Sequence, residues 1–263
     1  MHGFRLYFRL VGISLRSQWQ YRANMILLTL SNVLGSGIEF LGLWALFGRF
    51  GALGGWTLWE AGLFYGIGNM AFALCEAFFR EFDQFANYVR EGGFDRVLLR
   101  PRSTVLQLMG AQVQLLRFGR FAQGLAVLVI SISQLGLVWS AAQWMLLVMA
   151  IIGGALLFGG IIVLQAVSCF FTVESLEIWN SITFGGVYTI QYPLDVYHKL
   201  LKHFFMYVVP LAAINYWPCA VLLGHNYAPA WLGWLAPFIG AGVFIASLGV
   251  WQLGVRHYRS TGS

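Results

Sequence analysis

The side chains able to do chemistry gather in one stretch of this chain, residues 80–103. This stretch holds five of the sixteen Lys and Arg residues and four of the ten acidic residues, whereas only 10% of the whole chain is charged. Charges at this density need water, and the basic excess places that water on the cytoplasmic side of a membrane. We expect this stretch to be the contact through which a soluble partner holds the membrane part. The charged positions are Arg80, Glu81, Asp83, Arg90, Glu91, Asp95, Arg96, Arg100 and Arg102.

Motifs for catalysis or nucleotide binding are missing from the sequence. Neither of the two lysines, Lys199 and Lys202, follows a glycine-rich loop, so the chain has no P-loop for phosphate. The three cysteines stand alone in apolar surroundings and the five histidines are scattered, which predicts no metal site. Serines inside apolar stretches have no histidine partner nearby. An intramembrane enzyme is therefore a weak alternative, and we expect no cofactor in this chain.

Three polar residues interrupt long apolar stretches: Glu39, Asn69 and Glu76. A carboxylate in lipid is costly, so such residues face protein or a water path. We expect them to line a transport pathway or an interface between protomers. For Glu76, which lies one turn before the charged stretch, an alternative is a position at the membrane surface with access to water.

Composition predicts an all-α integral membrane protein with a single transmembrane domain, residues 1–263. The chain is 59% hydrophobic, and its mean hydropathy is +0.71. Only 10% of its residues are charged, against roughly 25% in soluble domains. Its length fits six spans of about 20 residues and leaves no room for a sizeable soluble domain. The expected spans are 24–47, 59–79, 118–138, 143–171, 178–190 and 231–255.

The regions before the first and third spans contain helical patterns outside the bilayer core. Residues 4–22 combine arginines with aromatic residues and predict an amphipathic helix in the headgroup region. A simple extension of the first span is the alternative. Residues 104–138 are expected to form one helix that starts in cytoplasmic water and enters lipid near Phe118, with Arg117 and Arg120 reaching back to the surface.

Residues 191–226 fit neither a clean span nor a soluble loop. Three prolines (Pro193, Pro210 and Pro218) and three charges interrupt apolar helical runs in this segment. We expect two short helices that dip into the outer leaflet and break at Pro210. Irregular backbone at that depth is tolerated only where protein shields it or where it lines a cavity.

The distribution of basic residues predicts both termini in the cytoplasm. With that topology, thirteen Arg residues lie inside, and only Arg49, Lys199 and Lys202 lie outside. This is a strong positive-inside bias. The net charge of +6 is thus explained by topology and by anionic lipid headgroups, because no concentrated basic face points to nucleic acid.

Two segments resemble the permease subunits of ABC-2-type exporters. The sequence GGFDRVLLRPRS (92–103) is similar to the family's G-x-D-x-x-L-x-R-P loop at Gly93, Asp95, Leu98, Arg100 and Pro101. Residues 192–218 resemble the family's outer hairpin, with a Tyr-Pro start, a central proline and an Asn-x-x-Pro end. With the hydropathy layout, the resemblance covers essentially the whole chain.

The resemblance implies a type V exporter in a bacterial inner membrane. Its partners would be an ATPase dimer that carries ATP and Mg, a second permease copy, identical or homologous, and membrane lipids. Separately from the resemblance, the 17% of aromatic residues and the absence of evident buried charge pairs favour a lipid-like or amphipathic substrate exported from the cytoplasm. Alternatives are a non-transporting scaffold or assembly protein, with the charged stretch as a solvated connector. The implied ATPase-coupling residues are Phe82, Phe85, Arg90, Gly93, Asp95, Arg100 and Pro101, and the implied outer-gate residues are Pro193, Pro210, Asn215 and Pro218.

Overall fold

The computed structural model describes residues 2–172 and 176–258, and helices joined by turns make up this part of the chain. Its only extended pairing is an isolated bridge between Leu53 and Trp56, in the turn that follows the second helix. The expectation of an all-α protein is therefore confirmed. The long helices are α1 (His2–Gln20), α2 (Arg22–Phe50), α3 (Leu58–Asp83), α7 (Arg117–Gln134), α8 (Ala141–Ser168), α9 (Leu176–Ile190) and α12 (Ala230–His257).

Short helices connect the long ones at both ends of the bundle. Three lie between α3 and α7, and a second group lies between α9 and α12. The first group is α4 (Phe85–Arg90), α5 (Gly93–Leu98) and α6 (Thr104–Ala111). The second is the 3₁₀ turn η1 (Leu194–Val196), α10 (Lys199–His203), the π-helical turn η2 (Phe204–Val208), the 3₁₀ turn η3 (Leu211–Ala213) and α11 (Tyr216–Leu223).

Among the described residues, four helices are long and apolar enough to cross a bilayer: α2, α3 with α4, α8 and α12. A fifth candidate is the bent pair Lys199–Val208 and Leu211–Leu223, whose halves meet at 75°. Two of the six expected spans coincide with shorter helices, because α7 has 18 residues and α9 has 15. The structure thus supports four to five spans by length and composition.

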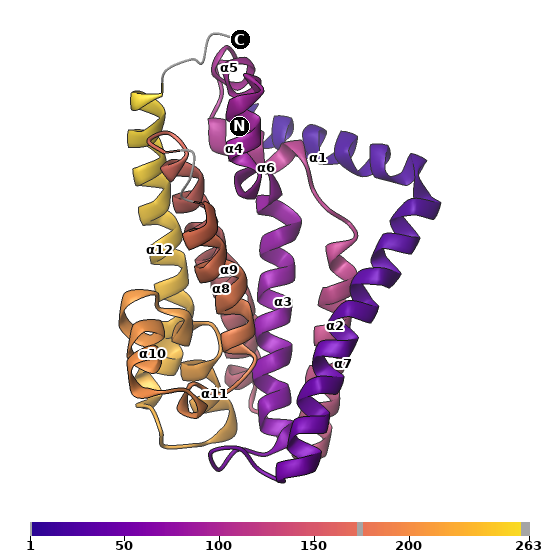
Figure 1. The fold of residues 1–263 in the computed structure, drawn as a ribbon, viewed down its shortest axis with the longest axis vertical. Coiled ribbons are helices and arrows are strands. Elements are labelled where there is room, and N and C mark those ends of the chain that lie inside the picture. Colours follow the sequence, from indigo (N-terminus) through magenta and orange to yellow (C-terminus); the bar gives the residue numbers. More distant parts are fainter. Residues whose placement is uncertain (1, 173–175, 259–263) are drawn as a thin grey trace.

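Helix α3 forms the centre of the molecule and contacts α7, α8 and α9 (Figure 1). Small residues let neighbouring helices approach it closely. A Cβ placed on Gly66 of α3 would lie 3.0 Å from the carbonyl oxygen of Gly124 in α7. Large rings fill the remaining space, with Phe72 of α3 packed edge-on against Phe158 of α8. Lipid gives no hydrophobic drive between helices, so this close packing supplies much of the attraction.

The elements separate into two ends (Figure 1). Helices α4–α6 and α1 lie at one end, with α1 running across the bundle. The α2–α3 turn, α10 and α11 lie at the other. Helix α2 leans outward, meeting the bundle at the α10–α11 end and diverging from α3 towards α1.

The expected continuous helix over 104–138 is wrong. Helix α6 ends at Ala111, residues 112–116 leave the helical path, and α7 begins at Arg117. The backbone of Gln112 is extended, with φ −138° and ψ 98°. Side chains of α1 and a carbonyl of α3 take over the hydrogen bonds that a helix would have made, which makes the break tolerable.

Candidate functional site: a charge network between α2, α3 and α7

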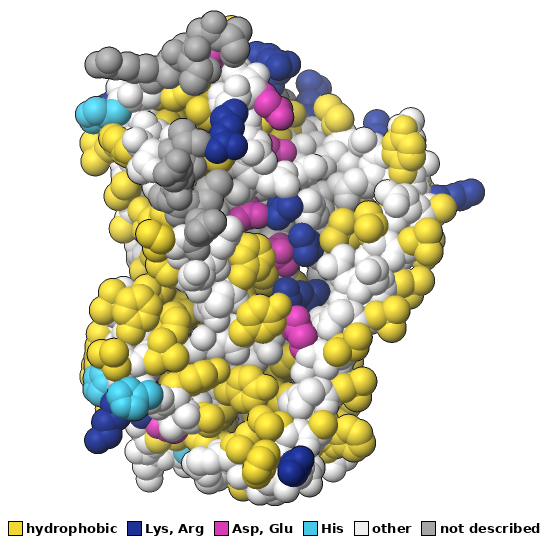
Figure 2. Space-filling model, in the orientation of Figure 1, with side chains coloured by type: hydrophobic (Ala, Val, Ile, Leu, Met, Phe, Trp, Pro, Cys, Tyr) yellow, Lys and Arg dark blue, Asp and Glu magenta, His cyan; other side chains and the backbone are white. Residues whose placement is uncertain are grey.

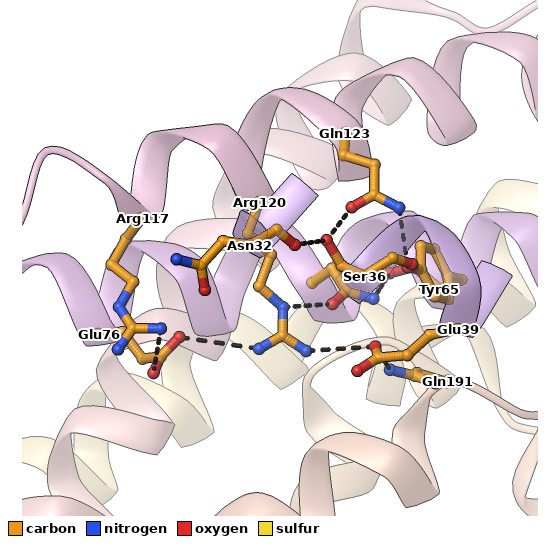
Figure 3. A network of polar contacts seen from close by, with 10 residues as sticks. Asn32, Ser36, Glu39, Tyr65, Glu76, Arg117, Arg120, Gln123 and Gln191 are labelled. Carbon is orange, nitrogen blue, oxygen red and sulfur yellow. Dashed lines mark hydrogen bonds and ion pairs between the residues drawn. The ribbon is translucent and has the colours of Figure 1, made fainter. Parts of the chain in front are cut away.

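Arg120, near the start of α7, is the centre of a polar network inside the helical bundle (Figure 3). Its Nε donates to Asn69 Oδ1 on α3 at 2.8 Å. The guanidinium lies 3.6 Å from a carboxylate oxygen of Glu39 on α2 and 3.7 Å from one of Glu76 on α3. Its carbon also lies 5.2 Å from the ring centre of Phe72. One arginine therefore joins three helices.

A second arginine completes the charge balance. Arg117 Nη1 lies 3.1 Å from Glu76 Oε1, and its Nε donates to Gln114 Oε1 at 2.9 Å. The Glu76 side chain is only 6% exposed and has an arginine at each of its two oxygens. Two arginines thus face two glutamates, which leaves the network neutral overall.

Neutral polar groups extend the network along α2. Tyr65 of α3 donates its hydroxyl to the Ser36 carbonyl at 2.7 Å, and Gln123 of α7 donates to the Tyr65 oxygen at 3.3 Å. The hydroxyl of Ser36 also donates to the Gln123 carboxamide oxygen. Gln191, which follows the last residue of α9, donates to Glu39 Oε2 at 3.2 Å. These bonds attach α2 to α3, α7 and the start of the 191–226 segment.

The network lies along a hollow rather than in a closed core. Figure 2 shows dark blue and magenta side chains gathered in a row between α2 and the rest of the molecule. The side chains of Arg120 and Glu39 keep 15% and 26% of their surface exposed. A partly open site of paired charges can be separated at less cost than a buried one, because water or a polar ligand can replace each partner. The arrangement is suited to movement of α2.

All three polar residues singled out within the apolar stretches, Glu39, Asn69 and Glu76, meet at Arg120. The expectation that Arg117 and Arg120 only reach back to the membrane surface is wrong, since both point to carboxylates on other helices. The contributions of the neutral residues were missed. The available signal was the pair of arginines three residues apart, which share one face of a helix. The missed residues are Ser36, Tyr65, Gln123 and Gln191.

The loop between α3 and α6 has a buried aromatic base. Phe82 and Phe85 are fully buried, with their ring centres 5.0 Å from that of Trp251 on α12. Phe94 packs edge-on against Phe85 at 5.0 Å. The expectation that Phe82 and Phe85 belong to an outward-facing coupling surface is therefore corrected: their rings fix the loop to the bundle.

The outer surface of this loop is basic. Arg90, Arg100 and Pro101 are exposed, and Leu99 presents 83% of its surface. A hollow of about 200 Å³ lies between Arg96 and Arg100 on one side and Tyr88 and Glu91 on the other. None of these arginines forms an ion pair with a residue that the structure describes. Such a surface can receive an acidic partner.

Two other loop residues have structural partners. Gly93 is buried, and a Cβ there would lie 3.0 Å from the Tyr88 ring, so a larger residue would have to displace that ring slightly. Asp95 lies near Tyr258, at the end of α12. Burial, followed by the Asp95 carboxylate, raises the pKa of the Tyr258 hydroxyl, which stays neutral at physiological pH.

The 191–226 segment closes the opposite end. Pro193 precedes η1, Pro210 lies in the break between the bent helices, and Pro218 lies in the first turn of α11. The buried carboxamide of Asn215 donates to the carbonyl oxygens of Phe64 and Ile190, so it ties the segment to α3 and α9. Asp195 accepts from Tyr216 at 2.8 Å and pairs with Lys202.

Within the described residues, no group of three His, Cys, Asp or Glu side chains is placed to hold a metal ion. The contacts that the site does show are ion pairs and hydrogen bonds between helices.

A comparison with protein families identifies the class. Residues 33–262 match the family described as ABC-2 family transporter protein. The match spans most of the chain, so the chain belongs to the ABC-2 transporter family and is a multi-pass membrane permease. No curated protein and no solved structure matches it.

Proposed function

We propose that this chain is the membrane subunit of an exporter that a separate ATPase dimer drives with ATP and Mg. In this proposal two permease copies, identical or homologous, form the pathway in a bacterial inner membrane. Each crosses six times, with α7 and α9 as the third and fifth spans and both termini in the cytoplasm. The exported substrate is lipid-like or amphipathic. The observation that carries the proposal is the network through which Arg120 joins α2, α3 and α7.

The network gives the transport cycle a movable element. Helix α2 carries Glu39 and is joined to the bundle through polar contacts and through the buried side chains of Leu43 and Phe47, while most of its outer surface is exposed. Moving α2 away from α7 exchanges the ion pair of Glu39 with Arg120 for contact with water, substrate or a second protomer. Rigid-body movement of one packed element against another is a common route between transporter states.

The basic loop is the proposed contact for the ATPase. Arg90, Arg100 and Pro101 face outward, and Asp95 lies beside them. Movement of this surface is then transmitted to α12 through the aromatic base, because Phe82 and Phe85 pack against Trp251 of α12. Trp251 in turn donates to Thr104 Oγ1 at the start of α6 at 2.9 Å. A displaced loop would therefore move α12 and α6 together.

The 191–226 segment is the proposed outer gate. Its break at Pro210 and its 75° bend leave backbone that cannot continue a helix. Asn215 fixes the segment to α3 at the Phe64 carbonyl. Because Gln191, where the segment begins, also holds Glu39, a shift of α2 would reach the gate directly.

The test is co-expression with an ABC-type ATPase from the same organism, followed by reconstitution into vesicles. We expect the two proteins to purify together and ATP hydrolysis to depend on the permease. Replacing Arg100 or Asp95 by Ala should weaken the complex, whereas Arg16→Ala, an exposed arginine of α1, should not. A wild-type chain that never associates with the ATPase contradicts the proposed function.

Unchanged association and unchanged stimulation of hydrolysis in the Arg100 and Asp95 variants would remove the coupling role of the loop. Transport of a fluorescent lipid in the same vesicles then tests the substrate class. The expected result is ATP-dependent movement that Arg120→Gln abolishes.

A further inference from the structure

The non-helical segment 112–116 interrupts the helical path between α6 and α7. Peptide groups that leave a helix lose their internal partners, and inside a membrane protein each must find another. At this joint, directly before α7, other parts of the chain therefore have to supply the missing partners. The structure shows which residues supply them.

Two side chains of α1 hold this segment. Ser14 and Gln18 are one helical turn apart, so they share a face of α1. The amide of Val113 donates to Ser14 Oγ and that of Leu115 donates to Gln18 Oε1, each at 3.0 Å. The Gln18 carboxamide also donates to the Val113 carbonyl. From α3, the Ala77 carbonyl accepts from the Gln114 amide at 3.0 Å.

The clamped segment leads directly into the charge network. Gln114, whose amide is fixed to α3, accepts from Arg117 Nε at 2.9 Å. Arg120 follows within one turn and makes the contacts to Glu39 and Glu76. The position of the joint thus sets where both guanidinium groups meet their carboxylates.

On its other side the joint continues into the basic loop. Gln107 of α6 donates to the carbonyls of Val97 and Arg102, each at 3.3 Å, which ties α6 to the loop. Helix α6 lies tightly on α1, since a Cβ on Gly110 would be 3.1 Å from Leu10 Cβ. Helices α1 and α6 therefore form one connected unit between loop and network.

We propose that Ser14 and Gln18 are positioning residues for Arg117 and Arg120. By clamping residues 112–116, α1 fixes the start of α7 and carries displacement of the basic loop to the charge network. Helix α1 thus lies across the end of the permease and also couples the basic loop to the charge network. The positioning of Arg117 and Arg120 by α1 does not depend on an ATPase partner, whereas its consequence for transport rests on the proposed function.

The position of the start of α7 relative to α2 can be measured by the rate at which a disulfide forms between cysteines placed on the two helices. A Cβ on Gly119 would lie 2.7 Å from Thr29 Cγ2, which places cysteines at these two positions within disulfide reach. The native cysteines are buried, so they contribute little background. The full chain carrying Thr29→Cys and Gly119→Cys is oxidised in membranes, without ATPase or substrate. Single-cysteine variants are the baseline.

We expect Gln18→Leu to slow this disulfide by about three- to tenfold, the effect of losing the net contribution of one or two hydrogen bonds. Ser14→Ala should act in the same direction, and Ser14→Thr, which keeps the hydroxyl, should restore the rate. Ser17→Ala is the matched control, because Ser17 is exposed on α1 and makes no side-chain hydrogen bond in the described part of the chain. Equal rates for Gln18→Leu and wild type would overturn the proposal.

The consequence for transport is tested by a double-mutant comparison. If Gln18 acts through Arg120, Gln18→Leu should reduce ATP-dependent transport in the wild-type background and add little in an Arg120→Lys background, which keeps the charge and with it part of the transport. Losses that add independently would contradict the link to the network. If the wild-type complex itself shows no ATP-dependent transport, the proposed function fails, and the disulfide rates still decide whether α1 positions α7.

Discussion

At the scale of single residues, Arg120 illustrates how one side chain can join three helices. It has a hydrogen-bonded partner on α3 and carboxylates on both α2 and α3. Guanidinium suits this task because it is planar, always charged and able to donate in several directions at once. A lysine would supply the charge from a single nitrogen and could not reproduce the geometry.

Removing Arg120 should destabilise the protein more than removing any exposed arginine. Arg120→Met leaves Glu39 and Glu76 partly unpaired. Breaking a fully buried pair costs roughly 3–5 kcal/mol, and this partly open network should cost less. We expect a lower midpoint of thermal unfolding in detergent and loss of transport. Arg16→Met is the control that removes the same charge from the surface of α1.

The combined variant Arg120→Met with Glu39→Gln should recover part of this loss, because it removes one of the two orphaned charges. If the double variant is no more stable than Arg120→Met alone, the ion pair between α2 and α7 contributes nothing to stability.

The sequence alone identified the acidic half of the network. Glu39, Asn69 and Glu76 stand out because each is costly in lipid. The sequence predicted a pathway or protomer interface for them, and only the structure shows that they meet at Arg120. The basic half was misjudged, since Arg117 and Arg120 lie near one end of an expected span, where arginine is usually at the membrane surface. Only the packing of α7 against α3 shows that they point inward.

At the scale of elements, close helix packing depends on particular glycines. Helix α8 meets α12 so tightly that a Cβ on Gly240 would lie 2.1 Å from the Gly153 carbonyl oxygen. A Cβ on Gly153 would lie 2.6 Å from the Pro237 backbone. The contact atoms are backbone, which cannot rotate away, so the two helices would have to separate.

Gly240→Ala should therefore destabilise the protein by about 1–3 kcal/mol, the usual cost of overpacking. Gly242→Ala, two positions along the same helix, should be neutral or slightly stabilising, because nothing lies within 4 Å of its Cβ position and alanine favours helix. Thermal unfolding of the two variants in the same detergent checks the difference. Equal midpoints would show that α8 and α12 accommodate the methyl group by small shifts.

The course of helices was predictable where apolar runs are long and unbroken, as in α8 and α12. The break at residues 112–116 was not. It contains no proline or glycine, and its local pattern favours helix. The non-helical path exists because residues almost a hundred positions away, Ser14 and Gln18, supply hydrogen bonds to its backbone. A local reading of sequence contains no sign of such distant partners.

At the scale of the whole molecule, the two ends differ in charge. The α4–α6 end carries the arginines of the loop, whereas the opposite end carries Arg49, Lys199 and Lys202. The positive-inside rule then assigns the α4–α6 end to the cytoplasm. This orientation is a prediction that labelling can decide.

A cysteine at Leu99 should react with a membrane-impermeant maleimide only in inverted vesicles, and one at Leu200 only in intact cells. The pair is well matched, since these leucines are 83% and 78% exposed at opposite ends. Labelling of Leu99→Cys from outside the cell would reverse the topology and rule out a cytoplasmic ATPase contact at the loop.

The polar attachment of α2 has a consequence for the lipids around the protein. Between α2 and α3 the diverging helices leave a hollow lined by paired charges, while the outer surface of α2 presents leucine and isoleucine. A two-part molecule with a polar head and an oily tail could place its head among those charges and leave its tail in the surrounding bilayer. Such a molecule, entering from the bilayer between α2 and α3, would not have to pass through water, and its tail would not have to leave the lipid. The cost of loading such a cargo would fall mainly on parting Glu39 from Arg120.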